Sequence, residues 1–200
     1  MNATPSSSTP LRAAASPDAT GILRLIDENL GEGHLLPRTL DDITRHTHRF
    51  LVADDGDGRI VACAELAPLS AAVAEVRSLV VDAAWRQRGL GSRLIGALGA
   101  QARRVGFSTL CAFTHGPGPF VRLGFSIVPH VWFPEKVALD CRACHKFRRC
   151  GQHAVALALD GSPLRAPAPS YRREPLTAAA PLARLVRAGP AEAAEPVAAP

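Results

Sequence analysis

The sequence is poor in several residue types, and each scarcity excludes a class of protein. Aromatic residues make up 5% of the 200 residues, so the core must be built from aliphatic side chains. No apolar run reaches the roughly 18 residues of a membrane-spanning helix, so no membrane partner is expected. Lysine occurs only at Lys136 and Lys146, and the net charge of +5 comes mostly from arginine. This small excess does not indicate a nucleic-acid partner.

The number of cysteines and the first ten residues indicate the cellular compartment of the protein. The chain has 5 cysteines, an odd number that favours a reducing environment over a disulfide scaffold. Residues 1–10 lack the charged and apolar regions of a secretory signal. We therefore expect a cytoplasmic protein.

Composition divides the chain into three parts. Residues 1–10 are mostly Ser, Thr, Pro and Asn, which predicts a disordered leader. Residues 161–200 contain 8 Pro and 12 Ala, and this spacing of proline blocks long helices and sheets. We expect a disordered tail there and one folded domain over residues 11–160.

Helical and strand patterns alternate within residues 11–160. Helices are predicted from Ser16 through Leu30, from about Thr39, over Leu90–Val105 and over Pro119–Leu123. Strands are predicted over Phe50–Ala53, Ile60–Leu66, Ala74–Val81, Thr109–Phe113, Phe125–Val128 and Ala154–Leu159. This order predicts an α/β (α+β) fold, in which helices pack on a mixed central sheet.

The stretch from Val76 to Ile95 carries the most information about chemistry. A predicted strand leads into a short loop, and Arg86-x-x-Gly89-x-Gly91 then opens a helix. Glycines let backbone amides approach a phosphate, and a helix N-terminus offers unpaired N–H groups at the positive end of its dipole. The pattern lacks the Gly-Lys-Ser/Thr of a P-loop and is not a dinucleotide fingerprint. A turn that only makes room for strand–helix packing remains the alternative.

These residues resemble the signature of the GNAT acetyltransferases, Arg/Gln-x-x-Gly-x-Gly/Ala after a bulged strand. Phe120-Val121-Arg122-Leu123-Gly124-Phe125 resembles a second element of that family. The resemblance covers about residues 11–160. It implies a GNAT fold with about six to seven strands and a V-shaped cofactor cleft, and acetyl-CoA as the acetyl donor. The resemblance leaves open whether the chain forms a homodimer.

The resemblance assigns cofactor contacts to two segments. A backbone N–H within the bulged strand would hold the thioester oxygen, and the loop and helix start would hold the pyrophosphate. The implied cofactor-binding residues are Leu79, Val80, Val81, Arg86, Gln87, Arg88, Gly89, Leu90, Gly91 and Ser92.

The acceptor is suggested by segments outside the shared signature. Gly33–Thr39 resembles a segment of the N-acetylglutamate synthases, in which an arginine matching Arg38 grips a carboxylate of glutamate. Pro134-Glu135-Lys136 also resembles a segment of these enzymes. We expect Arg38, Arg77 and Lys136 to bind a small amino-acid substrate, because basic side chains favour an anionic acceptor. The function implied is acetylation of the α-amine of glutamate, the first step of arginine biosynthesis.

Glu75 is the candidate catalytic residue. Strand alternation puts Glu75 and Arg77 on one face, where the carboxylate would take the amine proton, directly or through a water. A surface ion pair is the alternative. Many family members protonate the leaving thiolate with a tyrosine at the position of Phe120, so that acid is absent here.

The sequence departs from the N-acetylglutamate synthases in two respects, and two alternatives to glutamate acetylation are open. We expect no counterpart of the feedback-inhibition domain of the long N-acetylglutamate synthases, and Arg149–His153 departs from the segment with which those enzymes help to hold glutamate. The acceptor could instead be another small amine or a protein N-terminus. Cys141, Cys144, Cys150 and His153 have spacing that allows zinc, which would suit a non-catalytic binding module. We expect no metal and instead expect reduced cysteines packed near Phe147.

Overall fold

The computed structural model describes residues 9–32, 35–144 and 146–166, and all that follows refers to them. The expected leader (residues 1–10) and tail (161–200) lie mostly outside these ranges. No helix within the ranges combines the length and the apolar character needed to cross a membrane.

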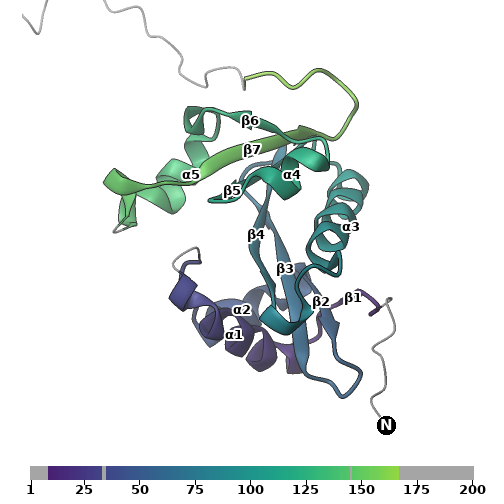
Figure 1. Ribbon diagram of the computed structural model, residues 1–200. Coiled ribbons are helices and arrows are strands. Elements are labelled where there is room, and N and C mark those ends of the chain that lie inside the picture. The colour runs from purple at the N-terminus through teal and green to yellow at the C-terminus, as the bar shows by residue number, and fades with distance from the viewer. Residues whose placement is uncertain (1–8, 33–34, 145, 167–200) are drawn as a thin grey trace, which may run out of the picture. The chain divides into compact units, whose positions relative to one another are not determined.

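A seven-stranded sheet organises the domain, in the order β1-β2-β3-β4-β5-β7-β6 (Figure 1). The strands are β1 (Arg12–Ala13), β2 (Phe50–Asp54), β3 (Ile60–Pro68), β4 (Val73–Val81), β5 (Thr109–Thr114), β6 (Ser126–Val128) and β7 (His153–Ala158). Only β4 and β5 run parallel, and the other neighbours are antiparallel. The predicted mixed sheet of six to seven strands is therefore confirmed.

Five α-helices and several short 3-10 turns flank the sheet in the described part of the chain. The helices are α1 (Ala19–Glu28), α2 (Leu40–His46), α3 (Leu90–Val105), α4 (Gly118–Arg122) and α5 (Pro134–Leu139). The 3-10 turns are Ser16–Asp18, Leu30–Glu32, Thr47–Arg49, Ala83–Trp85, His130–Trp132, Cys141–Ala143 and Phe147–Arg149. The Thr39 hydroxyl caps α2 by accepting the Asp42 N–H.

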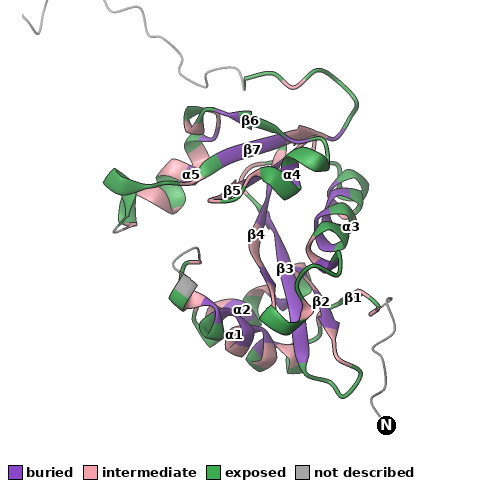
Figure 2. Ribbon diagram, in the orientation of Figure 1, coloured by how far each residue is buried: buried purple, intermediate pink, exposed green. Residues whose placement is uncertain are grey.

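Helices cover both faces of the sheet, so β3 is buried along nearly its whole length (Figure 2). Ala62, Ala64 and Leu66 alternate toward α3 and α4, where Leu94, Leu98 and Phe120 complete one core. On the other face, Cys63 and Val80 pack with Ile22 of α1 and Ile43 of α2. Farther along that face, Phe133 closes a smaller core over Cys111 and Ala156.

β4 and β5 pair only at their beginnings. Their register joins Val73–Glu75 to Thr109–Cys111 and then stops. Beyond this point, β4 pairs with β3 alone and β5 pairs with β7 alone, and the two strands part in Figure 1. Among the described residues, the edge of β4 from Val76 to Val81 thus has no strand partner on the β5 side. The V-shaped cofactor cleft stays a prediction.

Most boundaries differ from the sequence-based expectation by one or two residues, and two elements were not predicted. The first helix begins with a 3-10 turn at Ser16–Asp18, and α-helix proper starts at Ala19. The last strand runs over His153–Ala158, one residue earlier than expected. Strand β1 and helix α5 were not predicted, because β1 has two residues and the apolar residues of α5 after Pro134 stand together at its end and do not recur at helical spacing.

Candidate functional site

A bulge interrupts β4 at the point where it leaves β5. Cys63 pairs with Val80 and Glu65 pairs with Arg77, so two β4 residues stand opposite Ala64. The bulged residue Ser78 has φ +49°, which is unusual for a residue with a side chain. The bulge therefore reorients the backbone within the predicted carbonyl-binding strand.

The loop after β4 leads into the N-terminus of α3. Gly89 adopts φ +76° as the N-cap, and the first intrahelical bond runs from the Arg93 N–H to the Gly89 carbonyl. The N–H groups of Leu90, Gly91 and Ser92 precede that bond and point out of the helix end. A Cβ built on Gly89 meets nothing within 4 Å, so the surroundings of this turn are open. An anion can approach these amides.

The two loop arginines are held by protein groups. Arg86 donates from Nε to the Val81 carbonyl (3.0 Å) and from Nη2 to Asn29 Oδ1 (2.7 Å). The Arg88 guanidinium lies 5.0 Å from the centre of the Trp85 ring. Arg86 thus ties the loop to the end of β4 and to α1.

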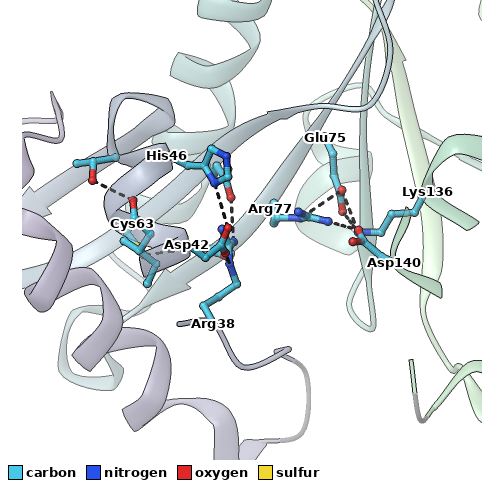
Figure 3. A network of polar contacts seen from close by, with 12 residues as sticks. Arg38, Asp42, His46, Cys63, Glu75, Arg77, Lys136 and Asp140 are labelled. Atoms are coloured by element: carbon cyan, nitrogen blue, oxygen red, sulfur yellow. Dashed lines mark hydrogen bonds and ion pairs between the residues drawn. The ribbon is translucent and has the colours of Figure 1, made fainter. Parts of the chain in front are cut away.

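Two polar clusters lie on the sheet face that α1, α2 and α5 cover (Figure 3). The Arg38 cluster comprises Arg38, Asp42, His46, Glu65 and Ser78. The Glu75 cluster comprises Glu75, Arg77, Lys136 and Asp140. Glu65 pairs with Arg77 in the β3–β4 register, so the two clusters adjoin.

Arg38 is the centre of its cluster. Its Nη1 donates to Glu65 Oε2 (2.9 Å) and to Ser78 Oγ (2.8 Å), and its Nε donates to Asp42. The Glu65 side chain is 1% exposed, whereas that of Asp42 is 35% exposed. Burial opposes the charge of Asp42, but the hydrogen bonds and charges of Arg38 and His46 together outweigh it, so the pKa of Asp42 lies below its ordinary value.

Lys136 is the centre of the second cluster. Its ammonium donates to both Glu75 oxygens (2.7 and 2.9 Å) and to Asp140 Oδ2 (2.8 Å). Arg77 contacts the same two carboxylates, with its Nε 3.5 Å from Glu75 Oε2. Burial disfavours the Asp140 carboxylate, but Lys136 and Arg77 outweigh it and lower its pKa.

These pairings change the expected charge of the site. The clusters bring together the predicted Arg38, Glu75, Arg77 and Lys136, but each cation is matched by a carboxylate. Asp42, Glu65 and Asp140 were not predicted. A carboxylate inside the otherwise apolar strand β3 was the sequence signal for Glu65. Spacing of four residues from Lys136 was the signal for Asp140.

The cysteines and Phe120 were singled out in the sequence for a metal site, for packing near Phe147 and for a missing acid. Within the described ranges, no group of three His, Cys, Asp or Glu side chains that could hold a metal ion occurs. Cys63 and Cys111 are buried, and burial raises the pKa of Cys63 to about 12. Cys141 and Cys144 are half-buried, whereas Cys150 and Phe147 are exposed, so the packing of the cysteines near Phe147 stays a prediction. Phe120 is buried against Phe125 and offers no acid.

Comparison with known proteins identifies similar chains. Residues 20–125 match the model of the acetyltransferase (GNAT) family. An uncharacterized N-acetyltransferase of Chlorobaculum tepidum is 32% identical over 155 residues, which cover 78% of this chain and 99% of that protein. An amino-acid acetyltransferase of Pseudomonas putida is 33% identical over 105 residues, 52% of this chain and 24% of that protein.

A solved structure shows the same similarity. It is N-acetylglutamate synthase of Neisseria gonorrhoeae complexed with coenzyme A and N-acetyl-glutamate, with a TM-score of 0.66 and 28% identity. The match covers 75% of this chain and 35% of that enzyme. This chain therefore spans about a quarter to a third of the two enzymes named for amino-acid acetylation.

Proposed function

Because this chain belongs to the GNAT family of acetyltransferases, we propose that it acetylates the α-amine of an amino acid, with glutamate as the acceptor. The chain is an N-acetyltransferase that uses acetyl-CoA as donor. Glutamate as acceptor would place the reaction at the start of arginine biosynthesis.

The cofactor contacts follow from the open helix end and the bulge. We assign the pyrophosphate to the loop and helix start, Arg86 to Ser92, where amides of the first turn of α3 are available. The thioester carbonyl is assigned to the backbone of Leu79–Val81, directly after the bulge. Acetyl-CoA would supply the electrophilic thioester carbonyl there. The residues present fit this group, because the helix dipole and the amides favour its phosphates.

The observation that carries the acceptor assignment is the position of two guanidinium groups next to the bulge. Arg38 donates to the bulged Ser78, and Arg77 precedes it on β4. Each arginine also contacts one outer carboxylate, Asp42 or Asp140, whose side chains are 35% and 25% exposed. We propose that the two carboxylates of glutamate exchange with these outer partners. The deeper carboxylates Glu65 and Glu75 stay in place.

Glu75 is the proposed proton acceptor for the attacking amine, directly or through a water. Its side chain is 4% exposed, and Lys136 contacts both carboxylate oxygens. The three N–H groups of Lys136 are matched by three carboxylate oxygens, two of Glu75 and one of Asp140. We therefore assign to Lys136 the role of orienting Glu75, in place of direct substrate contact.

A cationic small amine is the second candidate acceptor, because the clusters contain more carboxylates than cations. Asp42, Glu65, Glu75 and Asp140 face Arg38, Arg77 and Lys136. A polyamine would be attracted by the remaining negative charge. The name of the Neisseria enzyme supports glutamate instead, and that of the Pseudomonas enzyme supports an amino acid.

The experiment measures free-thiol release from acetyl-CoA with glutamate, glutamine, aspartate and spermidine as acceptors. Glutamate should be the preferred acceptor. Arg77→Ala should raise the KM for glutamate about 10- to 100-fold, the effect of losing a charged hydrogen bond. The KM for acetyl-CoA should stay unchanged, and Arg104→Ala, an exposed arginine of α3, is the control. Turnover of spermidine alone would reject glutamate and favour the second candidate.

A further inference from the structure

We propose that Glu65 is a positioning residue for acetyl transfer, which acts through Arg38 and Ser78 to fix the bulge of β4. The proposal rests on the proposed function in one respect, the placement of the thioester carbonyl at this bulge. It assigns the two edges of the Arg38 guanidinium to different tasks. Nη1 holds the bulge, and Nε, which donates to Asp42, can exchange that carboxylate for one of the substrate.

Glu65 is a charged residue in a strand that is otherwise apolar. Eight of the nine residues of β3 are buried, and the Glu65 side chain is 1% exposed. An ionised carboxylate at such depth needs a charged partner, and Arg38 Nη1 supplies it at 2.9 Å. The cross-strand neighbour Arg77 bonds to Asp140 instead. Glu65 therefore serves to fix the Arg38 guanidinium.

Arg38 passes this constraint to Ser78. The same Nη1 atom donates to Ser78 Oγ at 2.8 Å, from a loop 40 residues earlier in the chain. Ser78 adopts φ +49°, a conformation that a non-glycine residue keeps only when its surroundings impose it. The Cys63 thiol, 3.5 Å from the Ser78 carbonyl, is a second contact. The bulged residue is thus held at its side chain and at its carbonyl.

The position of the bulge gives this constraint a catalytic consequence. It lies after the last β4–β5 pair at Glu75 and Cys111, where no strand from the described part of the chain sets the direction of the β4 amides on that side. The conformation of Ser78 sets that direction for the residues that follow. A donor to a developing oxyanion must lie about 2.7–3.1 Å from the oxygen, and losing one donor lowers kcat about 100- to 1,000-fold. A loosened bulge should have a smaller effect of the same kind.

The test follows the carbonyl itself. Acetyl-CoA labelled with ¹³C at the acetyl carbonyl is bound to the full-length enzyme without acceptor, and its carbonyl infrared band is compared with that of free acetyl-CoA. Wild-type enzyme should shift the band to lower frequency, as a hydrogen-bonded carbonyl does. Ser78→Ala and Glu65→Gln should lose most of this shift. The exposed Ser126→Ala on β6 should keep it.

Kinetics with the best acceptor complete the test. Ser78→Ala and Glu65→Gln should lower kcat about 10- to 100-fold, with both KM values within about 3-fold of wild type. A normal band and normal kcat in both variants would overturn the proposal. So would a rise in the KM of the amino acid with an unchanged band, because Arg38 would then act on substrate alone. If Glu65→Gln does not fold, Ser78→Ala decides.

The two proposals fail in different ways. The band shift is measured without an acceptor, so it tests the bulge even if glutamate is not a substrate. Conversely, glutamate turnover with a band shift that survives in both variants would retain the proposed function and reject the role of Glu65.

Discussion

Replacing Lys136 by methionine should destabilise the protein by about 3 kcal/mol. Lys136 and Glu75 are 8% and 4% exposed, and the ammonium donates to both Glu75 oxygens. Removing one partner of a buried ion pair typically lowers the free energy of unfolding by about 3–5 kcal/mol, because the other charge stays buried. Arg77 Nε, 3.5 Å from Glu75, compensates in part, which favours the lower end. Methionine keeps the apolar stem, so little packing is lost.

Urea unfolding measures this effect. With a slope of about 2 kcal/mol/M, a loss of about 3 kcal/mol lowers the midpoint by about 1.5 M. Adding Glu75→Gln to Lys136→Met removes the unpaired charge and should restore part of the stability. The exposed Arg104→Met is the matched control and should change the free energy of unfolding by less than about 0.5 kcal/mol. If Lys136→Met loses less than about 1 kcal/mol, or the double variant is less stable than the single one, the buried pair as described is wrong.

Two further predictions concern the glycines at the ends of α3 and the stability of the protein at low pH. Gly89 (φ +76°) and Gly106 (φ +99°) flank α3, so alanine at either should lower the free energy of unfolding by about 1 kcal/mol. Only Gly89→Ala should also weaken CoA binding in a calorimetric titration, and equal CoA affinity in both variants would contradict the assigned cofactor loop. The pKa of Asp140 is lowered from 3.8 in the folded protein, so its pairing stabilises the fold above that pH and the contribution is lost as the pH falls below it. The Tm of Asp140→Asn should therefore be lower than that of the wild-type protein at pH 7, and it should depend less on pH below about 4. If the Tm values of the two proteins change with pH in the same way, the carboxylate of Asp140 does not stabilise the fold as described.

The elements whose bounds the sequence predicted best include those with a long hydrophobic pattern. The 16 residues of α3 and the nine of β4 repeat their apolar positions several times, and their bounds match the expectation closely. The six-residue α5 begins at a proline and offers little more than one turn of pattern. It nevertheless brings Lys136 to the site, and the resemblance had indicated this residue. Asp140, which directly follows α5, was missed.

Some features of the candidate site are contiguous in the sequence, and others join residues that are far apart in it. The loop from Arg86 to Gly91 is contiguous, so its residue types alone indicated an anion site. The pairs Arg38–Glu65 and Lys136–Glu75 join residues 27 and 61 positions apart. Only the strand order and the bulge register bring them together, and neither can be derived from local periodicity. The arginines and the lysine were predicted, but the carboxylates Asp42, Glu65 and Asp140 that neutralise them were not.

The carboxylates of Asp42, Glu65 and Asp140 change what the charge of the site implies about the acceptor. An unpaired cluster of cations would favour an anion by charge alone, but Arg38 and Arg77 already contact carboxylates of the protein. Glutamate can gain affinity here only by exchange, because each new ion pair replaces an existing one. Exchange is least costly at Asp42 and Asp140, which are partly hydrated already, and most costly at Glu65, which is 1% exposed. Specificity then depends on the geometry of two carboxylates relative to the bulge, more than on the net charge of the site.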